Sequence, residues 1–283
     1  MPEPTIQRPP ERERRTRRPR SGVHGVRMER ETAILLRISP VTNSSCMVNW
    51  LTASRGRLST LVKGCYRRKS LFLGQLDVFR TCELIFYAPL RIENAGIARD
   101  VSVLAARNRI RTLWRSSAVA SYLCDLAGHL SPEPVTGAAF ECLNLALDAL
   151  DAGRAPGSIL LWFELQMADH MGWRPRLESC AVCARPAEAN TPVLFSPGLG
   201  GLVCSACQSL RSSDGIKISA RLLAQIRERQ QARHPDHLSE IRLPIRDIQL
   251  LERGFGNFLQ HHLELNPVAR ALAFEGLRTP MPT

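Results

Sequence analysis

The sequence lacks the long apolar segments that membrane and secreted proteins carry. No run of apolar residues approaches the roughly 20 that a transmembrane helix needs, and the longest, at residues 159–163, is far too short. The arginine-rich beginning of the chain is not followed by the apolar stretch of a secretory signal. We therefore expect a cytoplasmic protein that does not bind membranes.

Motifs of the common enzyme families are also missing. The sequence has no phosphate-binding GxxxxGK motif, no HExxH or GxSxG motif, and no cluster of carboxylates resembling a nuclease metal site. Asp169 and His170 are adjacent near the end of a predicted apolar helix, where a structural histidine is more common than a catalytic one. We predict that the chain is not an enzyme.

The nine cysteines do not form the framework of a disulfide-rich domain. Four of them make two CxxC pairs, and the other five are scattered, mostly among apolar neighbours, where cysteine acts as a small hydrophobic residue. An odd total that includes CxxC pairs is typical of a reducing compartment. The five scattered cysteines are Cys46, Cys65, Cys82, Cys124 and Cys142.

The two CxxC pairs are separated by twenty residues. Each pair places two sulfurs on one tight turn, and two such turns joined by a hairpin supply four thiolates in a tetrahedron, as structural zinc requires. Proline and glycine between the pairs favour a looped hairpin. We predict a zinc-ribbon-like hairpin over residues 177–212 that binds one structural Zn²⁺ and leaves no coordination position for a catalytic water. The predicted ligands are Cys180, Cys183, Cys204 and Cys207.

Three other interpretations of these four cysteines stay open. They can be a redox pair, buried free thiols, or a ligand set that no longer binds a metal. A thioredoxin-like motif needs only one CxxC pair beside a strand–helix unit, so the presence of two pairs favours the metal site.

Positive charge is concentrated in the first third of the chain. The formal net charge is +12, of which residues 1–31 carry +4, residues 32–98 carry +6 and the remainder +2. This asymmetry favours a polyanionic partner. Residues 1–28 are rich in Pro and Arg and are predicted to be a disordered basic leader. The leader either adds nucleic-acid affinity or precedes the true initiator, Met28.

Residues 29–99 have the sequence pattern of a small β-barrel. Several short segments alternate apolar and polar residues, as half-buried strands do. Five short strands in under seventy residues suggest a closed barrel, and the OB-fold is the commonest of that size. The predicted strands are residues 32–39, 45–53, 57–63, 81–88 and 90–94.

A basic segment follows the second predicted strand. It contains six cations and no acid, with one tyrosine among them and Trp50 just before them. OB-folds bind oligonucleotides with cations that meet phosphates and aromatic rings that stack on bases, although a solvated loop is the ordinary reading of a charge run. Six phosphate contacts to a single strand predict that log affinity falls against log salt concentration with a slope of roughly −4. The predicted nucleic-acid contacts are Arg55, Arg57, Lys63, Tyr66, Arg67, Arg68 and Lys69.

The rest of the chain is helical apart from the cysteine hairpin. Thr136 is the predicted N-cap of one helix, and Gly153 and Gly172 follow the ends of two. We predict an α+β multidomain protein: an N-terminal OB-fold β-barrel, an α-helical bundle domain at residues 100–176, the four-cysteine zinc-ribbon-like hairpin inserted in the helical part, and C-terminal helices at residues 213–283. The predicted helices span residues 104–130, 136–151, 158–171, 219–231 and 245–264.

These parts in this order resemble the bacterial RecO family of DNA-repair proteins. The similarity is greatest between residues 121 and 207, in SYLCDLAGHLSPEP, WFELQMADHMGWRPRLESCAVC and FSPGLGGLVCSAC. In the barrel, RGRLSTLVKGCYRRKS resembles the basic segment of the family. The resemblance covers roughly residue 29 to the last predicted helix, and the leader is not typical of the family.

The resemblance implies a nucleoid-associated recombination mediator without ATPase activity. Such a protein binds single- and double-stranded DNA, anneals complementary strands, and works with RecR and often RecF to load RecA on gapped DNA coated by single-strand-binding protein. The basic segment would contact DNA, and the helical domain would dock the acidic, apolar-tipped tail of single-strand-binding protein. Cations beside an apolar stripe suit that tail, although a solvated helix face is equally compatible with Arg107, Arg109, Arg111 and Arg115.

Two other function classes remain as alternatives. A zinc-ribbon transcription or RNA-associated factor would use the same basic barrel and would prefer RNA to DNA. A metal-dependent hydrolase would need a catalytic cysteine site, which closure by four thiolates disfavours.

Overall fold

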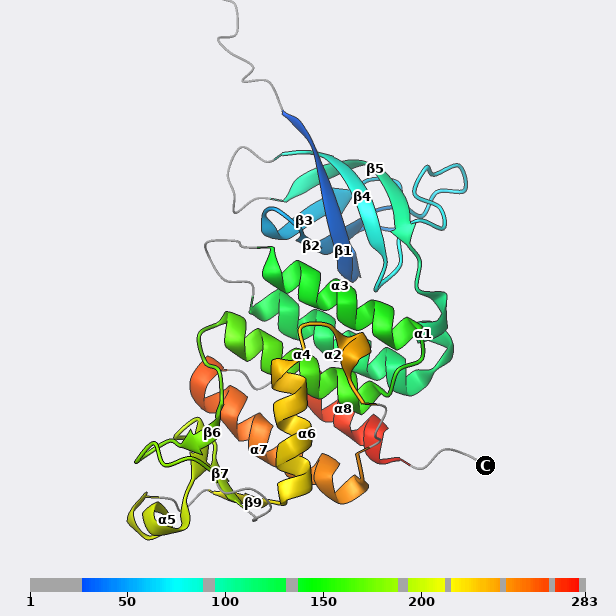
Figure 1. Cartoon of the computed structure of the whole chain (residues 1–283). Helices are drawn as coiled ribbons and strands as arrows, with labels where there is room; N and C mark the ends of the chain where they lie inside the picture. The colour runs from blue at the N-terminus through cyan, green and yellow to red at the C-terminus, as the bar shows by residue number, and fades with distance from the viewer. Residues whose placement is uncertain are drawn as a thin grey trace, which may run out of the picture.

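A barrel, a helical layer and a small sheet follow one another through the molecule, with the helices between the other two parts (Figure 1). The computed structural model describes residues 27–88, 95–130, 137–187, 193–211, 215–239, 243–264 and 268–279. The predicted basic leader therefore lies almost entirely outside the described residues. The predicted α+β organisation is confirmed.

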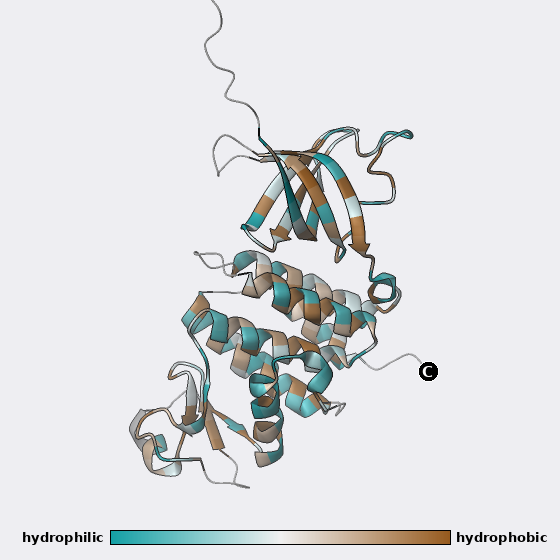
Figure 2. Cartoon of the chain, turned by 45° about the horizontal axis from the view of Figure 1, so that its top comes forward, coloured by the Kyte–Doolittle hydropathy of each residue, from teal (hydrophilic) through white to brown (hydrophobic). Residues whose placement is uncertain are grey.

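The N-terminal strands close into a barrel with the order β1-β2-β3-β5-β4, in which β4 also pairs with β1. Neighbouring strands are antiparallel except β3 and β5. A register shift between Leu35 and Arg37 bends the long strand β1 toward its second partner. Hydropathy alternates along these strands, as one buried face requires (Figure 2). The strands are β1 (Met28–Pro40), β2 (Cys46–Thr52), β3 (Gly56–Val62), β4 (Thr81–Tyr87) and β5 (Gly96–Ala105).

The fifth strand corrects the sequence analysis. The strand predicted at residues 90–94 lies outside the described residues, and the helix predicted from residue 104 begins too early, because Leu104 belongs to β5 and is 60% exposed. A register shift in the β4–β5 pairing leaves the inward residues Ala98 and Val101 three positions apart. That spacing imitates a helical period. The predicted domain boundary after residue 99 consequently falls inside β5.

Helix α4 lies at the centre of the helical layer, and every residue from Ser158 to Leu165 is buried. The predicted stop residues are confirmed, because Gly153 and Gly172 have φ of 90° and 79° directly after α3 and α4. Helix α3 begins after Gly137, whereas the predicted N-cap Thr136 lies outside the described residues. The helices are α1 (Asn108–Thr112), α2 (Trp114–His129), α3 (Ala138–Asp151), α4 (Pro156–His170), α5 (Ser205–Arg211), α6 (Ala220–Gln231), α7 (Ile245–Leu263) and α8 (Val268–Arg278).

Helix α8 was not predicted, and one charged residue lies among Ala273 and Phe274 on its buried face. Its Val268 and Leu272 are 79% and 58% exposed, whereas Arg270 is buried. Arg270 Nε donates to Glu164 Oε1 at 2.7 Å, and the hydroxyl of Tyr122 donates to the same oxygen at 2.6 Å. This buried ion pair joins α8 to α4 and α2, so each charge has a partner in the apolar core.

The cysteine region forms a four-stranded sheet with the order β6-β8-β7-β9. The predicted hairpin is present as the antiparallel pair β7 and β8, and β6 adds to it in parallel. Strand β9 pairs with β7 beyond the predicted boundary at residue 212, so the sheet continues into the segment assigned to C-terminal helices. The strands are β6 (Arg176–Cys180), β7 (Val193–Ser196), β8 (Gly201–Val203) and β9 (Ile216–Ile218).

One apolar core connects all three parts. Ile34 and Leu51 on the outer side of the barrel, and Phe195 and Ile218 of the small sheet, belong to the same buried cluster as the helices. The barrel has a second core of its own. None of the helices that the structure describes combines the length and the apolar character that crossing a bilayer requires.

A buried arginine fastens the barrel to the helices. Arg107 follows β5 with φ of 49° and is 5% exposed. Its guanidinium donates to Phe79 O and Thr81 Oγ1 at the barrel, at 2.7 and 2.9 Å. It also donates to Asn144 Oδ1 and Asp148 Oδ1 on α3, both at 2.7 Å. The two parts are therefore joined by directional bonds as well as by apolar contact.

The substitution Arg107→Ala should lower the free energy of unfolding by about 3 kcal/mol, because it leaves buried acceptors without their charged donor. Urea denaturation followed by circular dichroism measures the change. Arg111→Ala is the matched control: Arg111 is half exposed and pairs with Asp77, and its removal should cost less than about 1 kcal/mol. Equal losses in the two variants would contradict this role of Arg107.

Candidate nucleic-acid interface and metal centre

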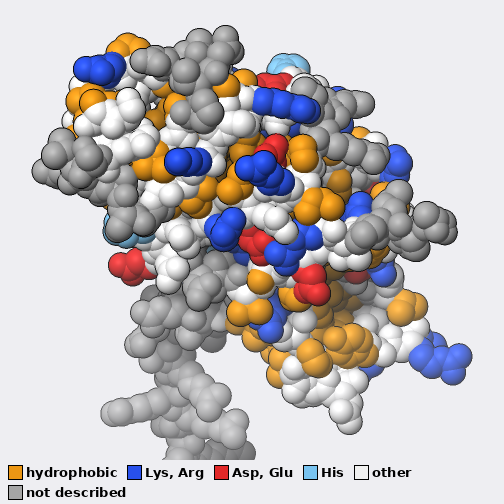
Figure 3. Space-filling view, turned by 90° about the horizontal axis from the view of Figure 1, so that it is seen from below, with side chains coloured by type: hydrophobic (Ala, Val, Ile, Leu, Met, Phe, Trp, Pro, Cys, Tyr) orange, Lys and Arg blue, Asp and Glu red, His pale blue; other side chains and the backbone are white. Residues whose placement is uncertain are grey.

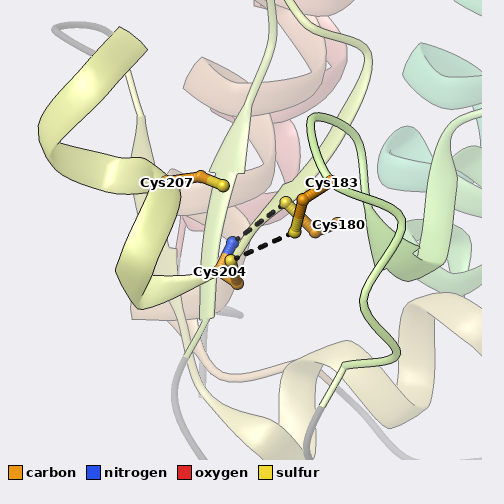
Figure 4. A group of neighbouring side chains, drawn as sticks. All are labelled: Cys180, Cys183, Cys204 and Cys207. Carbon is orange, nitrogen blue, oxygen red and sulfur yellow. Dashed lines mark hydrogen bonds between the residues drawn. The ribbon is translucent and has the colours of Figure 1, made fainter.

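The four predicted ligand cysteines lie together at the edge of the small sheet (Figure 4). Cys180 ends β6 and Cys183 lies on the turn after it, while Cys204 follows β8 and Cys207 lies in α5. Ala184, with φ of 60°, completes the first turn. The structure therefore brings the two distant CxxC pairs to one point, as the sequence analysis predicted.

The geometry of the cysteine group fits a tetrahedral metal ion. All four sulfurs lie within 4.8 Å of one another, and Cys183 Sγ and Cys204 Sγ are 3.7 Å apart. Bonds of about 2.3 Å to a tetrahedral ion place sulfurs about 3.8 Å apart. The backbone amide of Cys204 also donates to Cys180 Sγ at 3.4 Å, which suits a thiolate. These residues can hold one metal ion in a closed four-sulfur site.

The thiol pKa values in the group differ widely. Burial opposes ionisation of Cys180, but hydrogen bonds from the backbone amides of Cys183, Cys204 and Val182 outweigh it and lower the pKa of Cys180 to about 6. A hydrogen bond with the Cys204 side chain, followed by burial, raises the pKa of Cys207 to about 12. One sulfur of the group is thus prepared for metal binding by the backbone around it.

The structure divides the basic segment into two groups at opposite ends of β3. Arg55 and Arg57 lie at the β2–β3 turn and the start of β3, whereas Lys63 and the residues after it leave the end of β3. Lys63 lies six positions after Arg57 along the strand direction, which corresponds to about 20 Å. One short patch of contiguous cations is therefore not formed.

Arg55 is paired within the protein. Its guanidinium lies 2.5 Å from Glu29 Oε2 and 3.1 Å from Glu31 Oε1, both on β1. Two carboxylates already neutralise this cation, so it has less positive charge to offer a phosphate than an unpaired arginine has. Trp50 is also unsuited to stacking, because it is fully buried in the barrel and donates to Thr60 Oγ1 at 2.9 Å.

The second group lies on a loop that joins β3 to β4 (Figure 1). Its five predicted contact residues are all exposed, and Tyr66 is 53% exposed. Partial burial and the neighbouring thiols of Cys46 and Cys65 raise the pKa of the Tyr66 phenol. The residues are Lys63, Tyr66, Arg67, Arg68 and Lys69.

Buried anchors and backbone bonds hold this loop. The Cys65 side chain packs in the barrel core, with its sulfur 3.0 Å from that of Cys46. The Tyr66 amide donates to Ser44 O at 3.2 Å, and the Arg67 amide donates to Gly64 O at 3.1 Å. The cations therefore project from a structured support.

The arginines proposed to dock an acidic tail are mostly engaged within the chain. Arg107 is buried at the junction described above. Arg109 donates to Ala152 O at 3.1 Å, Arg111 pairs with Asp77, and Arg115 donates to Thr279 O. Sequence reasoning missed these partners because all of them are distant in the chain.

A groove of about 570 Å³ lies between α3, α4 and α6. Its lining includes Asp169 and His170, the adjacent pair considered in the sequence analysis. The Asp169 carboxylate accepts from Arg174 at 2.6 Å, which gives it a partner outside that pair.

The opposite end of the molecule differs from the barrel loop in charge. Seen from that end, cations, acids and apolar side chains are interspersed (Figure 3). From residue 54 to residue 76, in contrast, the chain contains six cations and no acid. The loop after β3 is therefore the better candidate for a polyanion.

Comparison with known proteins identifies the family. The model "Recombination protein O N terminal" matches residues 27–97, and "Recombination protein O C terminal" matches residues 111–271. DNA repair protein RecO of Anaeromyxobacter sp. (strain K) is 31% identical over 244 residues, covering 84% of this chain and 93% of the relative. RecO of Roseiflexus sp. (strain RS-1) is 30% identical, covering 90% and 89%. That of Dehalococcoides mccartyi (strain ATCC BAA-2266 / KCTC 15142 / 195) is 28% identical, covering 76% and 86%. With a barrel, a helical layer and a four-cysteine site in the order that the resemblance implied, the chain belongs to the recombination protein O family.

Proposed function

We propose that this chain is a DNA-binding recombination mediator of DNA repair that anneals complementary single strands. The observation that carries the proposal is the acid-free cationic loop after β3, presented by a closed barrel in a chain whose relatives are named DNA repair protein RecO. The barrel is assigned to the OB-fold, a five-stranded Greek-key barrel that binds oligonucleotides. The strand order β1-β2-β3-β5-β4 supports this assignment.

Annealing by such a surface needs no catalytic residue. Two complementary strands repel each other through their phosphates, and a cationic loop lowers that repulsion while the bases pair. Because contacts to phosphate carry no sequence information, the protein binds strands of any sequence. We accordingly propose a protein that is not an enzyme and that binds both single- and double-stranded DNA.

The proposed partners follow from the family. RecR, and often RecF, would act with this chain to load RecA onto gapped DNA coated by single-strand-binding protein. The acidic tail of single-strand-binding protein would bind the helical layer. Because Arg107 is buried and bonded, that tail would have to bind other cations of the layer.

The annealing proposal is tested with complementary oligonucleotides, one of them coated with single-strand-binding protein. The wild type should accelerate annealing at low salt, and Arg67→Ala/Arg68→Ala should lose most of that acceleration. Arg55→Ala is the matched control, because Arg55 already pairs with two acids, and it should keep most of the activity. No acceleration by the wild type would overturn the proposal, and preferential action on RNA would favour the RNA-associated alternative.

The dependence of single-strand affinity on salt should separate the same variants. Each lost phosphate contact lowers the slope of log affinity against log salt by about 0.7. Arg67→Ala/Arg68→Ala should therefore lower the slope by about 1.4, while Arg55→Ala changes it by less than about 0.4. The slopes are measured by fluorescence anisotropy of a labelled oligonucleotide at salt concentrations from about 50 to about 200 mM. An equal decrease in both variants would contradict the division of the basic segment.

We further propose that the four cysteines bind one structural Zn²⁺. The metal would be held by the four thiolates and would stabilise the small sheet without supplying a reaction centre. The sulfur separations and the amide bond to Cys180 support this assignment.

Purified wild type should contain one zinc ion per chain by plasma mass spectrometry, and Cys183→Ser/Cys204→Ser should lose it. The free energy of unfolding of the double variant should also be lower by at least about 2 kcal/mol, because metal binding contributes directly to folding. Cys124→Ala, a buried thiol outside the group, serves as the control and should retain the zinc. Wild type that holds no zinc and takes up none when it is added would refute the assignment.

A further inference from the structure

The loop after β3 also carries an exposed apolar tip. Leu71 and Leu73 are 70% and 64% exposed, among the most exposed large apolar side chains in the described residues. Phe72 between them is 9% exposed and packs in the barrel core. The buried phenylalanine anchors the loop, and the leucines project on either side of it.

This exposure belongs to an ordered part of the loop. Consecutive turns are closed by backbone bonds from Ser70 to Arg67 O at 2.9 Å, from Leu73 to Ser70 O at 3.2 Å, and from Gln75 to Phe72 O at 3.0 Å. A structured loop that holds two leucines in water forgoes the free energy of burying them. Apolar side chains held outward in this way suit a partner that covers them.

The charges beside the tip indicate which partner fits. Arg67, Arg68 and Lys69 directly precede it and are exposed. The nearest acid after them in the sequence is Asp77, which pairs with Arg111. A fitting ligand therefore carries negative charges and, close to them, an uncovered apolar surface that the two leucines can contact.

Single-stranded nucleic acid has both properties, and so has the acidic, apolar-tipped tail of single-strand-binding protein, which is proposed above to bind the helical layer instead. The phosphates of the nucleic acid carry the charge, and its unstacked bases expose apolar faces that side chains can cover. In a duplex those faces are stacked and out of reach. A membrane also combines negative charge with apolar surface. Binding at its interface, however, uses a broad apolar face such as that of an amphipathic helix, and two leucines provide a much smaller apolar area.

We propose that Leu71 and Leu73 contact the bases of single-stranded DNA while Arg67, Arg68 and Lys69 contact its phosphates. This inference rests on the proposed function and adds to it a source of preference for single strands over duplex. The cations serve both forms of DNA, whereas the leucines serve only the form whose bases are uncovered. The loss of the leucine–base contacts as the duplex forms then favours release of the product.

The variant Leu71→Ser/Leu73→Ser tests the inference in the full chain. Its affinity for a fluorescein-labelled oligo(dT) should fall about tenfold, because serine at both positions no longer buries apolar surface against the bases. Its salt slope should stay unchanged, and its affinity for a matched duplex should fall less than about twofold because phosphate contacts remain. Leu104→Ser, an exposed leucine on β5 of the same barrel, is the matched control and should bind as wild type does.

The outcomes separate this inference from the proposed function. If Arg67→Ala/Arg68→Ala weakens binding but the leucine variant binds oligo(dT) as wild type does, the base contacts are refuted and the DNA surface remains. If neither variant changes binding, the DNA surface itself is refuted. Unchanged oligo(dT) binding together with reduced sedimentation on phosphatidylglycerol vesicles would assign the leucines to a membrane and overturn the inference. Unchanged oligo(dT) binding together with weaker binding of a peptide of the acidic tail of single-strand-binding protein would assign them to that tail and overturn it likewise.

A second measurement does not depend on the variant folding. Wild-type protein irradiated with an oligonucleotide that contains 5-iodouracil should form crosslinks that mass spectrometry maps to the peptide containing Leu71 and Leu73. Crosslinks confined to the helical layer would overturn the inference.

Discussion

The rest of the structure depends on how the barrel is joined to the helices. The guanidinium of Arg107, buried between them, donates to the barrel backbone and to α3, and Ile34 and Leu51 of the barrel share an apolar core with the helices. A buried cation is costly unless its hydrogen bonds are complete, so Arg107 is stable in one relative arrangement of the two parts. That requirement gives the barrel a fixed position, and its loops a fixed direction, relative to the helical layer.

The loop after β3 has the opposite character, since its useful groups point away from the protein. Two apolar residues, Cys65 and Phe72, are buried in the barrel core, and the cations and leucines between and beside them are exposed. A rigid support reduces the entropy lost when such a loop binds. The metal site lies at the far end of the molecule (Figure 1), so its proposed role is to hold the small sheet and not to contact DNA at this loop.

The sequence predicted those features of the structure that depend on neighbouring residues, and it did not predict those that depend on contacts between distant segments. The cysteine group was predictable because CxxC spacing determines how two sulfurs lie on a turn. The helix ends at Gly153 and Gly172 were predictable because a positive φ depends on the glycine itself and not on distant residues. Strand β5 was misread where a register shift produced a helical spacing. The carboxylates that pair with Arg55, like the inward position of Trp50, depend on how strands meet, which composition does not reveal. Nothing local distinguished α8, whose buried Arg270 has its partner on α4.

The most direct test of the account is amide hydrogen exchange of the full chain with and without a saturating single-stranded oligonucleotide. We expect slower exchange in the loop at residues 63–76 and at the adjoining end of β3, with little change in the small sheet. Because the loop amides are bonded in short surface turns, they exchange fast enough for protection to be measured. Protection confined to the helical layer or the cysteine sheet, with the loop unchanged, would show that the barrel loop is not the DNA surface.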